Sequence, residues 1–129
     1  MSKQKDKESR QSLGSSFKNA WCGIWVAIKE ERNFKIHLGV MLGVLLLGIM
    51  IKLTRMEWFI CLILCAIVIS AELMNCAIEA IVDLVTQERH SLAKRAKDTA
   101  AGGVLICALI SALIGGCIFF PKMIELVLR

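Results

Sequence analysis

Three long apolar stretches, separated by short polar segments, dominate the pattern of hydrophobic and polar positions along the chain. They cover about residues 34–51, 58–85 and 99–120, and Pro121 is expected to end the third. A helix of about 20 apolar residues is long enough to cross the hydrocarbon core of a bilayer. The pattern therefore predicts an all-α membrane protein with three transmembrane helices.

A different pattern precedes the first apolar stretch. Residues 1–12 are polar and charged, which is typical of a disordered tail and not of a secretory signal peptide. In residues 13–33 apolar side chains recur at helical spacing, and this set comprises Phe17, Trp21, Ile24, Trp25 and Ile28. This pattern predicts an amphipathic helix that lies in the membrane interface, where tryptophan is favoured, and residues 13–129 then form one integral-membrane domain.

Composition supports the membrane interpretation. The chain has 129 residues, of which 57% are hydrophobic, and a formal net charge of +5. A soluble domain this small would bury too little of that apolar surface. The sequence has no basic face with interleaved aromatic residues, which argues against a nucleic-acid partner. The six cysteines lack metal-ligand spacing and are expected to be small buried hydrophobes.

The positive charges predict an orientation. Lysine and arginine gather before the first apolar stretch and again in the loop predicted at about residues 86–98. Because positively charged segments stay in the cytoplasm, both regions are expected there. The second helix would then run from the outside of the membrane to the inside.

The second helix carries a polar stripe. Glu72, Asn75, Glu79 and Asp83 are spaced by three, four and four residues, which places them on one helical face. About 28 residues span about 42 Å, against about 30 Å of hydrocarbon, so Glu72 lies inside the membrane and Glu79 at its cytoplasmic boundary. Ionisable side chains at such depth are costly and usually mark a functional site. The alternative is that the stripe only holds helices together.

The loop after the stripe adds further candidate chemistry. Lys97 is suited to neutralise phosphate charge, and Asp98 to anchor a ribose, an amine or a metal. A P-loop sequence is absent. These residues indicate a metal-dependent reaction on a lipid headgroup. Two other functions stay open, which are a small oligomeric proton-coupled transporter or channel with Glu72 as its proton site, and a non-catalytic scaffold.

Two motifs carry a resemblance to a known family. They are E-x-x-N-x-A-I-E-x-x-x-D at residues 72–83 and H-x-L-A-K-x-A-K-D at residues 90–98. Together they resemble the small bacterial integral-membrane lipid kinases, which include the prokaryotic diacylglycerol kinases and the related undecaprenol kinases. The stretch ERNFKIH at residues 31–37 and the Glu57-Trp58 pair are more similar to the undecaprenol kinase branch.

The resemblance implies a homotrimer in the bacterial cytoplasmic membrane. It implies ATP and Mg²⁺, with undecaprenol as the expected lipid acceptor and diacylglycerol as the alternative. The N-terminus and the active site would be cytoplasmic.

The resemblance also implies roles for single residues. Glu72 is similar to the family's catalytic base, Asn75 to the asparagine that orients groups around the reacting phosphate, and Glu31 and Glu79 to its magnesium ligands. The implied lipid contacts are Trp21, Trp25 and Glu72. The implied nucleotide contacts are Asn19, Glu31, Glu79, Glu88, His90, Lys97 and Asp98. Asn19 departs from the aromatic residue expected at its position, and Ser12 replaces an expected arginine, for which Arg10 is the nearest candidate.

Overall fold

The computed structural model describes residues 13–128, and within that range all regular structure is helical. Four helices follow one another there: α1 (Leu13–Glu30), α2 (Arg32–Met50), α3 (Arg55–Val85) and α4 (Ser91–Val127). Three of them, α2, α3 and α4, are long and apolar enough to cross a membrane. The predicted all-α class and the three long apolar helices are confirmed, whereas the predicted disordered tail and the positions of Ser12 and Arg10 lie outside the described residues.

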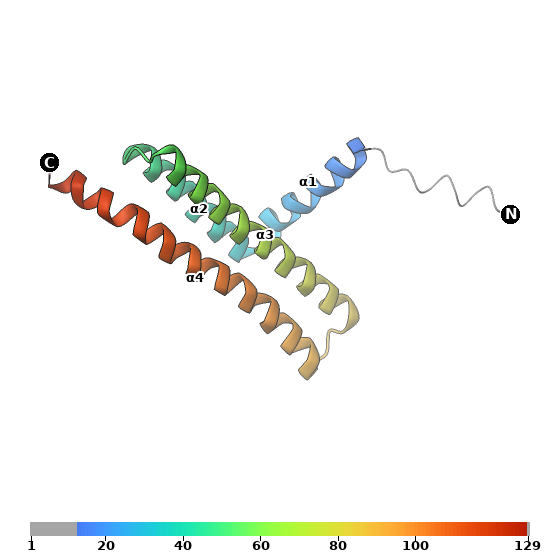
Figure 1. Ribbon diagram of the computed structural model, residues 1–129. Coiled ribbons are helices and arrows are strands. Elements are labelled where there is room, and N and C mark those ends of the chain that lie inside the picture. The colour runs from blue at the N-terminus through green and yellow to red at the C-terminus, as the bar shows by residue number, and fades with distance from the viewer. Residues whose placement is uncertain (1–12, 129) are drawn as a thin grey trace.

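The three long helices run side by side, and α1 projects away from them at an angle (Figure 1). α3 packs most extensively on α4 and less on α2, while α1 contacts α2 and α3 only near its own C-terminal end. Most large apolar side chains of the single chain are therefore exposed. Such surfaces are suited to lipid tails or to the apolar faces of other membrane helices, because apolar side chains need no hydrogen-bond partner there.

A single residue separates α1 from α2. Glu31 has extended backbone angles, with φ −95° and ψ 117°, so the helix breaks there. The break comes slightly before the predicted boundary at residues 33–34. The Glu31 amide donates the last hydrogen bond of α1 to the Ala27 carbonyl at 3.0 Å, and across the break the Lys35 ammonium donates to the Lys29 carbonyl at 2.8 Å. The bond between Lys35 and Lys29 links α2 to the end of α1.

The turn between α2 and α3 is held tightly. Thr54 caps α3 by a reciprocal pair of hydrogen bonds with Glu57, which satisfies backbone N–H groups at the helix start. Glu57 also forms an ion pair with Lys122 of α4, with 3.1 Å between nitrogen and oxygen. Beside this turn lies the apolar core cluster of Ile51, Leu53, Cys61 and Phe119. The end of α4 is therefore fastened to the start of α3.

The prediction that Pro121 ends the third apolar helix was wrong, because α4 continues through Pro121 to Val127. A proline inside a helix removes one backbone hydrogen bond and crowds the preceding turn. Tertiary contacts on both sides of Pro121 keep the helix intact: Phe119 is buried in the core cluster, and Lys122 is paired with Glu57.

The loop predicted at about residues 86–98 is also shorter in the structure. Only residues 86–90 are non-helical, and Ser91 already begins α4. The Nδ1 atom of His90 caps the helix by accepting a hydrogen bond from the Leu92 amide at 3.2 Å. Lys97 and Asp98 are therefore in the second turn of a helix, which gives them fixed directions relative to α3.

Candidate functional site

The polar stripe of α3 is buried at its N-terminal end. Glu72 and Asn75 are the only buried polar or charged side chains among the described residues, with 2% and 5% of their surface exposed. Burying an ionisable or amide group without full compensation costs about 1–3 kcal/mol or more. Two such groups one turn apart in a 31-residue apolar helix therefore point to a function beyond packing.

Asn75 connects the buried part of the stripe to its surface part. Its Nδ2 group donates a hydrogen bond to Oε1 of Glu79 at 3.0 Å. Its Oδ1 atom is buried and has no hydrogen-bond partner within residues 13–128. Buried polar atoms are nearly always satisfied in folded proteins. The Oδ1 oxygen is therefore available to a donor or cation that residues 13–128 do not supply.

Glu31 approaches the stripe from the break between α1 and α2. It lies within electrostatic range of Glu72, and Glu79 does so from the same helix. Cys76 lies within range of all three acids. Three carboxylates from two places in the sequence thus converge on one end of the bundle. No group of three or more His, Cys, Asp or Glu side chains forms a metal cage in the described part of the chain.

A cleft of about 600 Å³ opens between α1 and α3 beside these acids. Asn19, Glu31 and Cys76 are among the residues that line it. Asn19 and Glu31 therefore face the same cleft, and their contact with one ligand stays a prediction. Cys76 was not among the predicted site residues. Its place in the sequence between Asn75 and Glu79 could have indicated that it lies beside them.

A second hollow, of about 500 Å³, is an apolar groove between α2, α3 and α4. It extends from His37 and Val68, next to Glu72, to Phe119 at the opposite end of the bundle. His37 also lies within electrostatic range of Glu72. The predictions did not include His37 as a site residue. The predicted lipid contacts Trp21 and Trp25 are exposed on α1 and are absent from the linings of both hollows.

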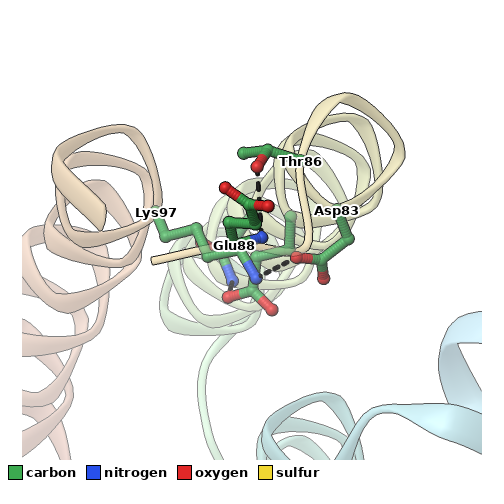
Figure 2. Close-up of polar contacts among 6 residues, drawn as sticks. Asp83, Thr86, Glu88 and Lys97 are labelled. Carbon is green, nitrogen blue, oxygen red and sulfur yellow. Dashed lines mark hydrogen bonds and ion pairs between the residues drawn. The ribbon is translucent and has the colours of Figure 1, made fainter. Parts of the chain in front are cut away.

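The start of α4 brings the basic side chain of Lys97 to the C-terminal end of the stripe. Lys97 donates a hydrogen bond to Asp83 of α3 at 2.6 Å (Figure 2). Lys97 also lies within electrostatic range of Glu79. In the connecting loop the Thr86 hydroxyl accepts a hydrogen bond from the Glu88 amide at 3.1 Å (Figure 2). The loop geometry thus sets Lys97 against the surface part of the stripe.

The other predicted nucleotide contacts lie near Lys97 in sequence, and each has a local role in the structure. Asp98 is paired with Lys94 one turn earlier on α4. His90 is the N-cap of α4. Glu88 is exposed in the loop, where its backbone is fixed by Thr86. These residues lie where α3 and α4 connect, and their contacts with a nucleotide stay a prediction.

Comparison with known proteins identifies the family. The family model for prokaryotic diacylglycerol kinase matches residues 18–119. An undecaprenol kinase of Bacillus subtilis is 44% identical over 120 residues, covering 91% of this chain and 98% of the relative. Diacylglycerol kinases of Synechocystis and Haemophilus influenzae are 38% and 31% identical, over 86% and 84% of this chain and 64% and 92% of their own lengths.

The family match spans the stripe, both motifs and all but the end of α4, and the relatives are named as kinases of lipid alcohols. The resemblance inferred from residues 72–83 and 90–98 is confirmed. A transporter or a scaffold without catalysis is not supported by these matches. The chain therefore belongs to the prokaryotic diacylglycerol kinase family and is an integral-membrane lipid kinase, for which ATP is the implied phosphate donor.

Proposed function

We propose that this kinase transfers the γ-phosphate of ATP to the hydroxyl of undecaprenol, in a reaction that requires Mg²⁺. The observation that carries the proposal is the stripe itself, in which buried Glu72 and Asn75 continue into half-buried Glu79 with Glu31 nearby. This arrangement joins a membrane-embedded carboxylate to surface carboxylates. It suits a reaction between a lipid hydroxyl and a water-soluble nucleotide.

Glu72 is proposed as the general base. Its position inside an apolar helix, beside the groove that ends at His37 and Val68, is suited to a hydroxyl at the head of a long hydrocarbon chain. The carboxylate accepts the hydroxyl proton as the lipid oxygen bonds to the γ-phosphorus and the bond to the ADP oxygen breaks. General bases of this kind contribute about 10²–10⁴-fold to rate.

Glu31 and Glu79 are proposed to hold Mg²⁺. Magnesium in nucleotide-dependent enzymes is commonly bound by one or two carboxylates together with substrate phosphates, and not by a protein cage. The two carboxylates, with the unpaired Oδ1 of Asn75 close by, fit that donor set. Mg²⁺ held by these residues would supply positive charge to offset that of the phosphates. Asn75 keeps Glu79 oriented by its hydrogen bond.

Lys97 is proposed to neutralise phosphate charge, while Asn19, Glu88, His90 and Asp98 surround the rest of the nucleotide. Phosphoryl transfer depends mainly on alignment and charge stabilisation, so a lysine at this place is expected to matter as much as the base. Trp21 and Trp25 are proposed to hold α1 in the membrane interface, where their exposed rings would meet lipid headgroups. The membrane would be the bacterial cytoplasmic membrane.

A homotrimer is proposed as the working form. Support comes from the single chain, whose apolar faces are largely uncovered and whose cleft beside Glu31 is open on one side. A neighbouring protomer would cover both. Helices in membranes associate through close packing and through polar groups, which the stripe supplies.

The acceptor is tested by competition between two lipids. Purified protein in mixed micelles receives labelled ATP, Mg²⁺ and equal amounts of undecaprenol and diacylglycerol. We expect most of the label in undecaprenyl phosphate, in line with the undecaprenol kinase relative. Preferential labelling of phosphatidic acid would instead assign the chain to diacylglycerol, the acceptor in the names of the other relatives.

A further inference from the structure

The ion pair between Asp83 and Lys97 joins two helices at the cytoplasmic end of the bundle. Asp83 lies one helical turn after Glu79 on the stripe face of α3, and Lys97 lies in the second turn of α4. The Lys97 ammonium is 2.6 Å from an Asp83 carboxylate oxygen and also interacts electrostatically with Glu79 (Figure 2). The proposed reaction assigns no role to Asp83.

The ion pair contributes little to the stability of the fold. The Lys97 side chain is 34% exposed and that of Asp83 is 59% exposed. Ion pairs this accessible to water contribute little to folding, because solvent screens them and two long side chains lose freedom. The ion pair instead restricts Lys97 to one conformation, whereas an unpaired lysine side chain samples many rotamers.

We propose that Asp83 is a positioning residue that holds Lys97 beside Glu79 before the nucleotide binds. The inference rests on the proposed nucleotide site, because Lys97 is there the phosphate contact. A lysine that is already fixed loses little freedom when the phosphates arrive, so ATP binds more tightly. Once the site is filled, the phosphates themselves orient Lys97, and the chemical step no longer depends on Asp83.

The sign of the effect separates this role from a simple charge effect. Asp83 is an anion near the proposed site of the anionic phosphates, and by repulsion alone its removal would strengthen ATP binding. If Asp83 positions Lys97, its removal weakens ATP binding. The two explanations therefore predict opposite changes in the KM for ATP.

The test compares Asp83→Asn, Asp83→Glu, Lys97→Met and the double variant Asp83→Asn/Lys97→Met as full-length protein in mixed micelles at saturating lipid and Mg²⁺. For Asp83→Asn we expect the KM for ATP to rise about three- to tenfold, the order expected when a ligand must immobilise one more long side chain, with kcat unchanged. Asp83→Glu keeps the negative charge and should therefore keep most of the affinity for ATP. In the Lys97→Met background, Asp83→Asn should cause no further rise.

Glu125→Gln is the matched control, because it removes one exposed negative charge near the opposite end of α4. Its KM for ATP should equal that of the parent protein. An unchanged or lower KM in Asp83→Asn, beside a raised KM in Lys97→Met, overturns the positioning role and leaves the proposed site intact. An unchanged KM in Lys97→Met removes Lys97 from the nucleotide site, and the positioning role falls with it. Gel filtration and thermal unfolding of each variant verify that the fold is kept.

Discussion

At the scale of single residues, depth in the membrane separates two kinds of carboxylate on one helix. Glu72 and Glu79 are seven residues apart, which is about 10 Å along a helix axis. Glu72 is buried and lies next to an apolar groove, whereas Glu79 is half-buried and hydrogen-bonded to Asn75. The first is suited to a lipid hydroxyl and the second to a metal and phosphates.

The division of labour predicts the kinetics of Glu72→Gln. This change keeps the shape of the side chain and removes its basic oxygen. We expect kcat to fall by about 10²-fold or more, the usual contribution of a general base, while the affinity for MgATP stays the same. Turnover under saturating conditions and a separate nucleotide-binding measurement provide both numbers. A parallel loss of nucleotide affinity would place Glu72 with the nucleotide and not with the lipid.

Glu79→Gln is expected to behave differently. The substitution leaves the hydrogen bond from Asn75 possible but removes the negative charge that is proposed to bind Mg²⁺. We expect weaker MgATP binding and a higher Mg²⁺ requirement, which a titration of activity with Mg²⁺ would measure. Full turnover at ordinary Mg²⁺ concentrations would contradict the assignment of Glu79 as a ligand.

At the scale of helices, Leu53 and Trp58 pack closely against Gly48 at the turn between α2 and α3. A Cβ atom placed on Gly48 would lie 2.9 Å from Leu53 and 2.9 Å from the ring of Trp58. Lys52 in the same turn has a left-handed backbone, with φ 54°. Left-handed backbone is unfavourable for lysine, so the surrounding contacts must hold it. This turn therefore fixes how α2 lies against α3.

Gly48→Ala is predicted to destabilise the protein. Alanine favours a helix over glycine by about 0.5–1 kcal/mol, but at Gly48 the added methyl group collides with a rigid indole ring. We expect a lower midpoint of thermal unfolding in detergent. Gly39→Ala is the matched control, because nothing lies within 4 Å of the added Cβ there. An equal or higher midpoint for Gly48→Ala than for Gly39→Ala would contradict this packing.

At the scale of the whole molecule, the charges and the site must share one side of the membrane. The structure places Lys97 beside the surface end of the stripe, while Glu57 and Lys122 are paired at the opposite end of the bundle. Positive charge at residues 89–97 therefore predicts a cytoplasmic site. ATP would reach Glu79 from that side.

Cysteine labelling tests this orientation. In a cysteine-free background, Ser91→Cys should react with a membrane-impermeant reagent only from the cytoplasmic side, and exposed Met56→Cys only from outside. Met56 is chosen because its substitution leaves the Thr54–Glu57 cap intact. Labelling of Ser91→Cys from outside would invert the topology and separate the site from cytoplasmic ATP.

The homotrimer is tested by cross-linking the purified protein in detergent. If the proposed homotrimer is the working form, the largest closed product should have three times the 14.3 kDa mass of one chain. A fully active monomer would show that one chain completes the site alone.

The sequence by itself determined the apolar helices, the stripe and the family. These features depend on local periodicity and on short motifs, such as the spacing of Glu72, Asn75 and Glu79, which any helix converts into one face. The expected end of the last helix at Pro121 failed because the contacts of Phe119 and Lys122 with distant residues outweigh the local preference of proline.

Only the tertiary structure decided which residues from separate helices meet. The break at Glu31 carries that acid to α3, and the short loop at residues 86–90 returns α4 so that Lys97 reaches Asp83. The same packing placed His37 near Glu72 and left Trp21 and Trp25 outside both hollows. Pairings of this kind depend on helix directions and loop geometry, which no local pattern of residues encodes.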